Sequence, residues 1–342
     1  MSSSKVDFIK RQRTDCDDYN QSVVGLYAFA SSCTWDSSAG RPRPGSRVCI
    51  PRKMTLVQQD GIPDEREVTP DGVVQVSVDY GVVAEMKKHF PTRDHAELFE
   101  QVHKYAMTMK GWWTDSSLIA AHDVVLLTHI ASATDACDAY DSWLAQGNQL
   151  GRPFAIVEFG YLEQGQLWFL LRRRTGQLSD AAHDADLRRG KQLGVEVLTD
   201  VFSQRKFMEN EPPLVLMMVL VYTYALPLFI REEEFKSGAG TRHPIALAST
   251  SKVREALQQQ FVPTTGDERE FTLPRAGWVR QALDSLVRLG LGQRPDSVDG
   301  EYRIAIKKPR TKDLIEYFSD RLFVLNKETQ QAQAEEQRGL FE

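Results

Sequence analysis

The sequence has few cysteines, and their spacing excludes two common kinds of site. Its 342 residues include only Cys16, Cys33, Cys49 and Cys137, and no two of these form a C-x-x-C pair. Zinc sites and disulfide frameworks both depend on closely spaced or matched cysteines. We therefore expect reduced, partly buried thiols, with no bound metal and no cofactor.

Positive charge is also in short supply. The chain has 42 Lys and Arg against 47 Asp and Glu, which gives a net charge of −5 and a pI near 5.9. A protein that coats nucleic acid with its whole surface would be basic, so binding here would have to use local patches. The hydrophobic content of 42% is ordinary for a globular protein, and the length leaves room for two domains.

The familiar catalytic signatures are missing as well. There is no G-x-x-x-x-G-K-[ST] loop, no G-x-S-x-G elbow and no H-E-x-x-H helix. The pairs His95/His103 and His122/His129 are spaced eight and seven residues apart, which does not match a metal-binding helix. We expect packing or surface histidines and a protein that is not an enzyme.

Long apolar runs are rare. One run, from Pro212 to Ile230, has 19 residues without a charge, which is just long enough to suggest a membrane span. Pro227 interrupts it, and no excess of Lys and Arg flanks it. The first residues contain no apolar h-region of a secretory signal. We expect a buried core helix, no membrane partner, and a cytoplasmic protein of a bacterium, plasmid or phage.

The patterns that are present predict an α+β fold. Residues 1–20 are polar and predict an arm, whereas residues 22–84 are rich in β-branched and aromatic residues and predict strands. Helical periodicity predicts a helix from about residue 92 and a long helix or helical pair over 116–147. The segment 154–171 reads as a hairpin.

Two groups of arginines are candidate phosphate contacts. Arg41 and Arg43 stand in a Gly/Pro/Ser-rich loop, and Arg172, Arg173 and Arg174 follow the aromatic second strand of the expected hairpin. Arginines beside aromatic rings suit a nucleic-acid surface, where rings stack and guanidinium groups meet phosphate. A solvated loop and a solvated sheet edge are the alternative readings.

The segment "HPIALASTSKVREALQQQF" resembles the strand, loop and helix that open the inosine-triphosphatase and Maf families of nucleotide pyrophosphatases. The resemblance would place Lys252 and Arg254 on phosphates. The segment lacks the usual Pro after the small polar run, and too little chain follows it for such a domain. The simpler expectation is a short strand, a cap at Thr250 or Ser251, and an amphipathic helix.

With its surroundings, that segment is similar to the winged helix-turn-helix superfamily. The order is a helix at 213–235, a short strand, a second helix, a third helix ending at Gly290, and a two-stranded wing. One departure is the linker "VPTTGDEREFTLP", about 13 residues long where three or four are usual. The domain is thus expected to bind DNA or, as many divergent winged helices do, a protein.

Local charge favours nucleic acid. Between Arg275 and Lys312 there are nine basic and four acidic residues, a net charge of +5 in a chain whose total is −5. The front of the third helix would reach a groove, and the wing would hold backbone phosphates. The residues expected to make these contacts are Arg275, Trp278, Arg280, Gln281, Arg294, Arg303, Lys307 and Lys308.

The last residues carry one further pattern. "QRGLF" resembles the Q-x-x-L-F peptide with which bacterial replication and repair proteins bind the sliding clamp. The resemblance assigns polar contacts to Gln337 and places Leu340 and Phe341 in an apolar pocket. The alternative is a tail that folds these two side chains back onto the body.

These observations predict a polar arm over 1–20, a mixed α/β body over 21–210, a winged-helix-like domain over 211–325 and an exposed tail over 326–342. The expected function is non-enzymatic binding of nucleic acid, DNA in preference to RNA, as in a replication initiator or regulator. The alternatives are a structural subunit of a larger nucleoprotein or defence-type complex, and a nucleotide pyrophosphatase.

Overall fold

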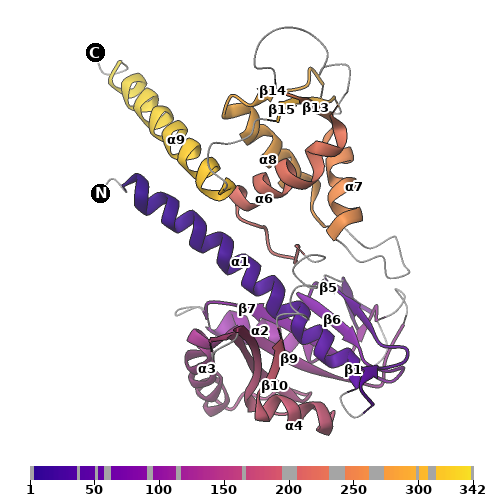
Figure 1. Ribbon diagram of the computed structural model, residues 1–342. Helices are drawn as coiled ribbons and strands as arrows, with labels where there is room; N and C mark the ends of the chain where they lie inside the picture. Colours follow the sequence, from indigo (N-terminus) through magenta and orange to yellow (C-terminus); the bar gives the residue numbers. More distant parts are fainter. Residues whose placement is uncertain are drawn as a thin grey trace. The chain divides into compact units, whose positions relative to one another are not determined.

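The computed structural model describes residues 4–36, 39–50, 53–57, 63–90, 95–112, 117–163, 167–194, 206–230, 243–261, 273–297, 300–306 and 313–339. Helices and sheets are both abundant among them, so the fold class is α+β, as predicted (Figure 1). Contacts divide the described chain into two compact units. The sheet unit contains residues 20–210, and the helical unit contains residues 4–19 and those from 211 onward.

The sheet unit is built on one seven-stranded sheet, whose order is β12-β11-β10-β9-β7-β6-β3. β7, β9 and β10 run parallel to one another, and the remaining neighbours pair antiparallel. The strands are β3 (Arg47–Cys49), β6 (Gly72–Gln75), β7 (Tyr80–Lys87), β9 (Ala121–His129), β10 (Phe154–Glu163), β11 (Leu167–Gly176) and β12 (Lys191–Gly194).

Helices cover both faces of this sheet. On one face, α2 (His95–Tyr105) and α3 (Ala133–Ala145), which follows the short helix η1 (Ile130–Ser132), join one apolar core with β7, β9 and β10. On the other face lie the second half of α1 (Lys5–Thr34) and α4 (Ala181–Arg189). Because β7, β9 and β10 are covered on both faces, nearly all of their side chains are buried.

Two smaller sheets complete the unit. β1 (Trp35–Asp36) pairs with β2 (Arg41–Pro42), and a second sheet has the order β5-β4-β8. Its strands are β4 (Met54–Val57), β5 (Pro63–Val68) and β8 (Met109–Lys110).

Cys16 of the helical unit and Cys33 of the sheet unit are buried free thiols, in agreement with the expected reduced state.

Three predictions of local structure are wrong. Residues 5–20 form the start of α1 where an arm was expected, and "SVVGLYAFA", expected as a strand, continues the same helix. A short apolar run that is buried on all sides has no period by which a strand differs from a helix. Residues 121–129, expected in a helix, form β9, because a central parallel strand is also a continuous apolar run. The predicted helix α2 and hairpin β10–β11 are confirmed.

The helical unit follows the predicted order of elements from residue 214 onward. The helix α6 (Leu214–Leu220) continues through one π-helical segment, Val221–Ala225, and one 3-10 segment, Leu226–Phe229. It is a buried core helix, and Pro227 stands in its last, 3-10 segment. None of the described helices has the length and apolarity needed to cross a bilayer.

The remaining elements of this unit form a small sheet with helices on it. The strand order is β13-β15-β14, with both pairs antiparallel. Gly290 ends the helix α8 with a φ of +70°, a conformation that glycine adopts without strain. The elements are β13 (Ile245–Ala248), α7 (Thr250–Phe261), α8 (Ala276–Arg288), β14 (Gly292–Gln293), β15 (Tyr302–Ala305) and α9 (Leu314–Gly339).

The start of α1 packs on α9 inside the helical unit. The rings of Phe8 and Phe323 lie 5.6 Å apart, and Arg13 bonds Asp313 at 2.6 Å. The expected tail from residue 326 is helical as far as Gly339. The contacts change unit between residues 210 and 211, and the first half of α1 belongs to the helical unit.

Candidate functional site

A carboxylate and an ammonium group stand two residues apart near the end of β7. Alternate residues of a strand share one face, so Glu85 and Lys87 lie side by side. Lys87 Nζ donates to Glu85 Oε1 at 2.6 Å. The carboxylate is buried and the lysine side chain is half-buried, so the pair connects the interior of the sheet unit with solvent.

A second carboxylate, that of Asp71, lies opposite Glu85. Gly72 pairs with Ala84 in the β6–β7 ladder, and one register step further brings Asp71 across from Glu85. Asp71 Oδ2 accepts the backbone N–H of Met86 at 2.8 Å. Asp71 is 4% exposed and Glu85 is 2% exposed, so two acidic side chains share one buried place.

The protonation states of Asp71, Glu85 and Lys87 depend on one another. Burial and the neighbouring charge of Glu85 together raise the pKa of Asp71 to about 7, despite the opposing effects of the Met86 N–H and of Lys87. Burial works against the charged form of Lys87, but the attraction of Glu85 and Asp71 outweighs it and raises the pKa of the lysine. At neutral pH the lysine is therefore a cation, beside two carboxylates that resist being charged together.

Helix α2 supplies a hydrogen-bond donor to the second carboxylate oxygen of Glu85. Tyr105 Oη donates to Glu85 Oε2 at 3.0 Å, and Gln101 Nε2 donates to Tyr105 Oη at 2.6 Å. Gln101 and Tyr105 are four residues apart, so one face of α2 carries both. This chain of hydrogen bonds holds the carboxylate oxygen of Glu85 that Lys87 does not contact. We call Asp71, Glu85, Lys87 and Tyr105 the carboxylate site.

Polar residues continue from the carboxylate site across the sheet. Lys87 pairs in register with Thr128, Thr128 with Glu158, and Glu158 with Arg172. Glu158 is fully buried and holds both Arg172 and Arg174. Lys87 and Thr128 stand at the carboxyl ends of β7 and β9, and Glu158 lies in the middle of β10.

The donors of the carboxylate site are suited to a hard divalent cation. Mg²⁺ takes oxygen ligands and is commonly held by one or two carboxylates, with water and substrate phosphates completing its shell. Asp71 uses only Oδ2 in its hydrogen bond to Met86, which leaves Oδ1 for a cation. Within the described ranges, no three His, Cys, Asp or Glu side chains gather as a complete metal cage. The site thus fits Mg²⁺ or Mn²⁺ better than a structural Zn²⁺.

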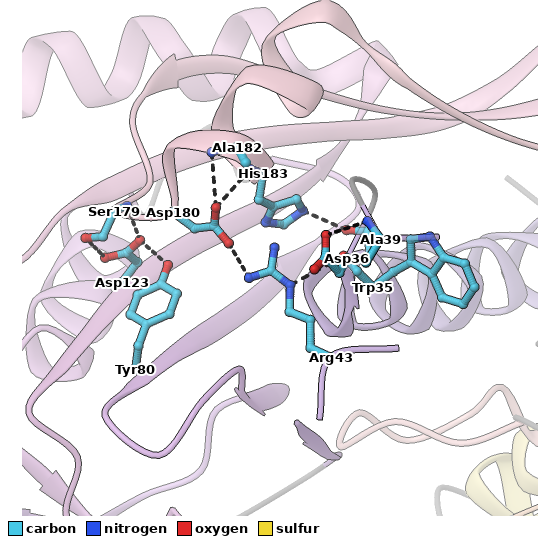
Figure 2. Close-up of polar contacts among 11 residues, drawn as sticks. Trp35, Asp36, Ala39, Arg43, Tyr80, Asp123, Ser179, Asp180, Ala182 and His183 are labelled. Atoms are coloured by element: carbon cyan, nitrogen blue, oxygen red, sulfur yellow. Dashed lines mark hydrogen bonds and ion pairs between the residues drawn. The ribbon is translucent and has the colours of Figure 1, made fainter. Parts of the chain in front are cut away.

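A second polar cluster lies near the amino ends of β7 and β9 (Figure 2). Asp123 is fully buried, and its carboxylate accepts Tyr80 Oη at 2.6 Å, Ser179 N at 2.6 Å and Ser179 Oγ at 2.7 Å. Each carboxylate oxygen accepts a hydrogen bond, so the hydrogen-bonding needs of this buried group are met without a ligand. Its role is to tie the loop before α4 to the sheet.

The same cluster accounts for Arg43. Asp180 caps α4 by accepting hydrogen bonds from the backbone N–H groups of Ala182 and His183 (Figure 2). Its Oδ2 also forms an ion pair with Arg43 Nη1 at 2.5 Å. Burial alone would raise the pKa of Asp180, but the His183 N–H and Arg43 hold it below its usual value. His183 lies 3.0 Å from Ser32 Oγ. Arg43, a predicted phosphate contact, is thus half-buried and engaged in an internal ion pair.

The predicted nucleic-acid residues of the helical unit divide into exposed and buried ones. Arg275, Arg280 and Gln281 of α8 and its N-cap are exposed, as are Arg294 and Arg303 of the hairpin. Trp278 is the exception, because it is only 7% exposed. The guanidinium of Arg275 lies over its ring, 5.4 Å from the centroid. The expectation that Trp278 reaches a groove is therefore wrong, since its apolar ring is part of the core.

Two of the exposed arginines meet in one hollow. Arg280 and Arg294 line a surface pocket of about 370 Å³ between α8 and the hairpin. Asp284 stands between them, bonded to Arg294 at 2.9 Å and to Tyr302 Oη at 2.9 Å. Asp296 also lines this hollow, so two carboxylates stand beside its two guanidinium groups.

The other predicted site residues are dispersed. Arg41 is exposed on β2, whereas Arg173 points to the sheet face opposite Arg172 and bonds Asp184 at 3.1 Å. The backbone of Gln337 belongs to α9. Predicted residues outside the described part of the chain are Lys307, Lys308, Leu340 and Phe341.

The carboxylate site was missed in the sequence, although a signal is present. The pattern is Asp71, thirteen residues, then Glu85-x-Lys87 on a β-branched strand. The E-x-K spacing places two opposite charges on one face of a strand, a place where apolar residues are expected in a buried sheet. Asp71 joins them only through hairpin pairing, which short-range patterns do not give.

Comparison with known protein families, curated proteins and solved structures finds no match to this chain.

Proposed function

We propose that the sheet unit hydrolyses phosphodiester bonds of nucleic acid with a divalent cation held by Asp71 and Glu85. The helical unit then serves as a DNA-binding domain of the winged-helix type. One observation carries the proposal: two almost fully buried carboxylates face each other, with a lysine at 2.6 Å from one of them. Lys87 balances the charge of only one of the two carboxylates, so this arrangement has a surplus acid.

A bound cation would balance the surplus negative charge of the carboxylate site. A buried charge without a partner is costly, and two carboxylates at one place cannot both ionise cheaply. The raised pKa of Asp71, about 7, reflects this cost. A divalent ion would neutralise both groups and make the ionised state the stable one.

The residues of the site have distinct roles in such a reaction. A cation bound here would act as a Lewis acid on a phosphate oxygen and would lower the pKa of a water molecule. Lys87, charged at neutral pH, stabilises the negative charge that develops on the phosphate. Water oxygen bonds to phosphorus, the bond from phosphorus to the leaving sugar oxygen breaks, and that oxygen takes up a proton. Tyr105 and Gln101 hold Glu85 in position.

The helical unit supports nucleic acid as the substrate. Its elements follow the order helix, strand, helix, helix and hairpin, and its strand order is β13-β15-β14. This order is the one expected of a winged helix, where the third helix enters a groove. Arg280 and Arg294 carry exposed positive charge on the third helix and the hairpin.

The test is cleavage of labelled duplex and single-stranded DNA by the full chain. We expect cleavage with Mg²⁺ or Mn²⁺, no cleavage in EDTA, and a loss of at least a hundredfold in kcat for Asp71→Asn and for Lys87→Ala. Glu67→Gln is the matched control, because Glu67 is an exposed carboxylate of the same unit paired with Lys53. Cleavage that persists at the wild-type rate in Asp71→Asn would overturn the proposal.

A second candidate is a nucleic-acid-binding protein without catalysis, such as a replication initiator or regulator. Glu85 already has two partners, Lys87 and Tyr105, and no ready three-ligand metal cage exists among the described residues. These facts favour a structural role for the acids. This candidate predicts salt-dependent binding of DNA by the wild type, with no cleavage under any divalent cation.

A further inference from the structure

We infer that Arg172 and Arg174, both held by Glu158, form a phosphate-binding clamp for the backbone of the nucleic-acid substrate beside the carboxylate site. The inference rests on the proposed function, because it names a substrate contact of the same sheet edge. We call Glu158, Arg172 and Arg174 the arginine clamp. It lies on the hairpin β10–β11, where Glu158 pairs in register with Arg172.

The geometry of the clamp is well defined. Arg172 Nε donates to Glu158 Oε1 at 2.6 Å, and its Nη2 lies 2.5 Å from the same oxygen. Arg174 Nη1 donates to Glu158 Oε2 at 2.8 Å. Glu158 is fully buried, whereas the side chains of Arg172 and Arg174 are 42% and 34% exposed. One buried acid therefore fixes two guanidinium groups that reach solvent.

The clamp has a net positive charge and N–H donors that Glu158 does not use. Two guanidinium groups against one carboxylate leave an excess of one positive charge. Each guanidinium has five N–H groups, and the bonds to Glu158 use only some of them. Arginines that are already oriented lose little entropy on binding, so the remaining donors are ready for phosphate oxygens.

An independent observation lies between the clamp and the carboxylate site. Thr128 is fully buried, and its Oγ1 has no hydrogen-bond partner among the described residues. Its register partners are Lys87 on one side and Glu158 on the other. A buried hydroxyl without a partner is costly, so this unused group points to a polar ligand along the row.

The distances fit a polynucleotide backbone. Lys87 and Arg172 are separated by three strand spacings, or about 14 Å. That length corresponds to the axial rise of roughly four base-pair steps of a duplex, at about 3.4 Å per step. A backbone laid along this row would place one phosphate at the carboxylate site and others at the clamp.

The neighbouring Arg173 differs from Arg172 and Arg174 in its surroundings. It lies on the opposite face of β11, is largely buried and bonds Asp184 at 3.1 Å. Three consecutive arginines thus divide between a candidate ligand surface and an internal ion pair. The division follows from the two-residue period of a strand.

The experiment measures the salt dependence of DNA binding by the full chain in EDTA, by fluorescence anisotropy with a labelled random-sequence duplex. Each phosphate contact contributes about 0.9 to the slope of log Kobs against log salt. We expect the slope to fall by about two in the double variant Arg172→Ala/Arg174→Ala, and Kd to rise about 30-fold at ~0.15 M salt. Arg189→Ala is the control, since Arg189 is an exposed arginine of the same unit.

The single variants Arg172→Ala and Arg174→Ala keep one partner on Glu158, and each is expected to lower the slope by about one. They replace the double variant if its thermal unfolding shows that it does not fold. An unchanged slope in folded variants overturns the clamp, even if the wild type cleaves DNA in Mg²⁺. A lowered slope without any cleavage overturns the proposed hydrolysis and leaves the clamp in place as a binding site.

Discussion

Asp71 and Glu85 face each other across the β6–β7 hairpin, one register step beyond the Gly72–Ala84 pair. Fourteen positions apart in the sequence, they become neighbours only when the hairpin forms. Their shared burial gives this chain a pair of acids whose charges compete.

Divalent cations are expected to stabilise the folded protein. At a concentration of Mn²⁺ one hundred times its Kd, binding to the native state contributes about 2.7 kcal/mol. For a unit of this size, that corresponds to a rise in Tm of roughly 5 to 11 °C. Asp71→Asn should abolish the rise, whereas Glu67→Gln should keep it. Equal shifts in wild type and Asp71→Asn, measured by differential scanning fluorimetry, would show that the cation binds elsewhere.

Loss of the tyrosine hydroxyl is expected to disturb the position of Glu85. Tyr105→Phe removes the donor to Glu85 Oε2 and leaves a buried acceptor with one partner fewer. The free energy of unfolding in urea should fall by about 1 to 3 kcal/mol. In the cleavage assay kcat should drop while KM changes little, because Tyr105 positions a site residue and does not hold substrate. A change in KM alone would assign Tyr105 to substrate binding.

Acid is expected to destabilise the sheet unit through two buried histidines. Burial lowers the pKa of His122 and of His183 to about 4, whereas both titrate near 6.5 when unfolded. The unfolded chain then binds protons first, so stability is fully present above pH 6.5 and is lost as the pH falls toward 4. Each histidine contributes on the order of 3 kcal/mol to this loss.

The measurement is the urea midpoint at a series of pH values between 4 and 8 for wild type and His122→Gln. The variant should lose less stability than wild type on acidification, although it is less stable at pH 8. Parallel pH profiles of the two proteins would mean that His122 has the same pKa in the folded and the unfolded protein.

The helical unit offers a separate test of DNA binding. Arg280→Ala/Arg294→Ala should lower the salt slope of DNA binding by about two without changing Tm. Arg288→Ala is the matched control, because Arg288 is exposed at the far end of the same helix. If both variants lower the slope equally, the contact is a diffuse charge effect and not a docking of α8 and the hairpin.

Trp278 is expected to act on stability, in contrast to its exposed neighbours. Its ring is almost fully buried, so Trp278→Ala should reduce the free energy of unfolding by about 3 to 5 kcal/mol. Trp278→Phe keeps most of the apolar volume and should lose less. A folded Trp278→Ala with wild-type stability and impaired DNA binding would restore the groove contact that the sequence suggests.

The sequence predicted the helical unit better than the sheet unit. From residue 245 to residue 305 its elements are short, and the apolar period identifies the amphipathic helices α7 and α8. In the sheet unit, "SVVGLYAFA" and "AHDVVLLTH" are buried on all sides, and their local patterns do not separate helix from strand. Their packing in the tertiary structure decided that the first segment is a helix and the second a strand.

The amino-acid sequence by itself determined the α+β class, the order of elements after residue 211, and the E-x-K spacing that places Glu85 and Lys87 on one face. These features depend on local periodicity. Only the tertiary structure decided that Asp71 meets Glu85, that Glu158 holds Arg172 and Arg174 while Arg173 faces the other way, and that Trp278 is core. Such relations depend on strand register and on which faces are covered, and both are set by contacts between residues distant in the chain.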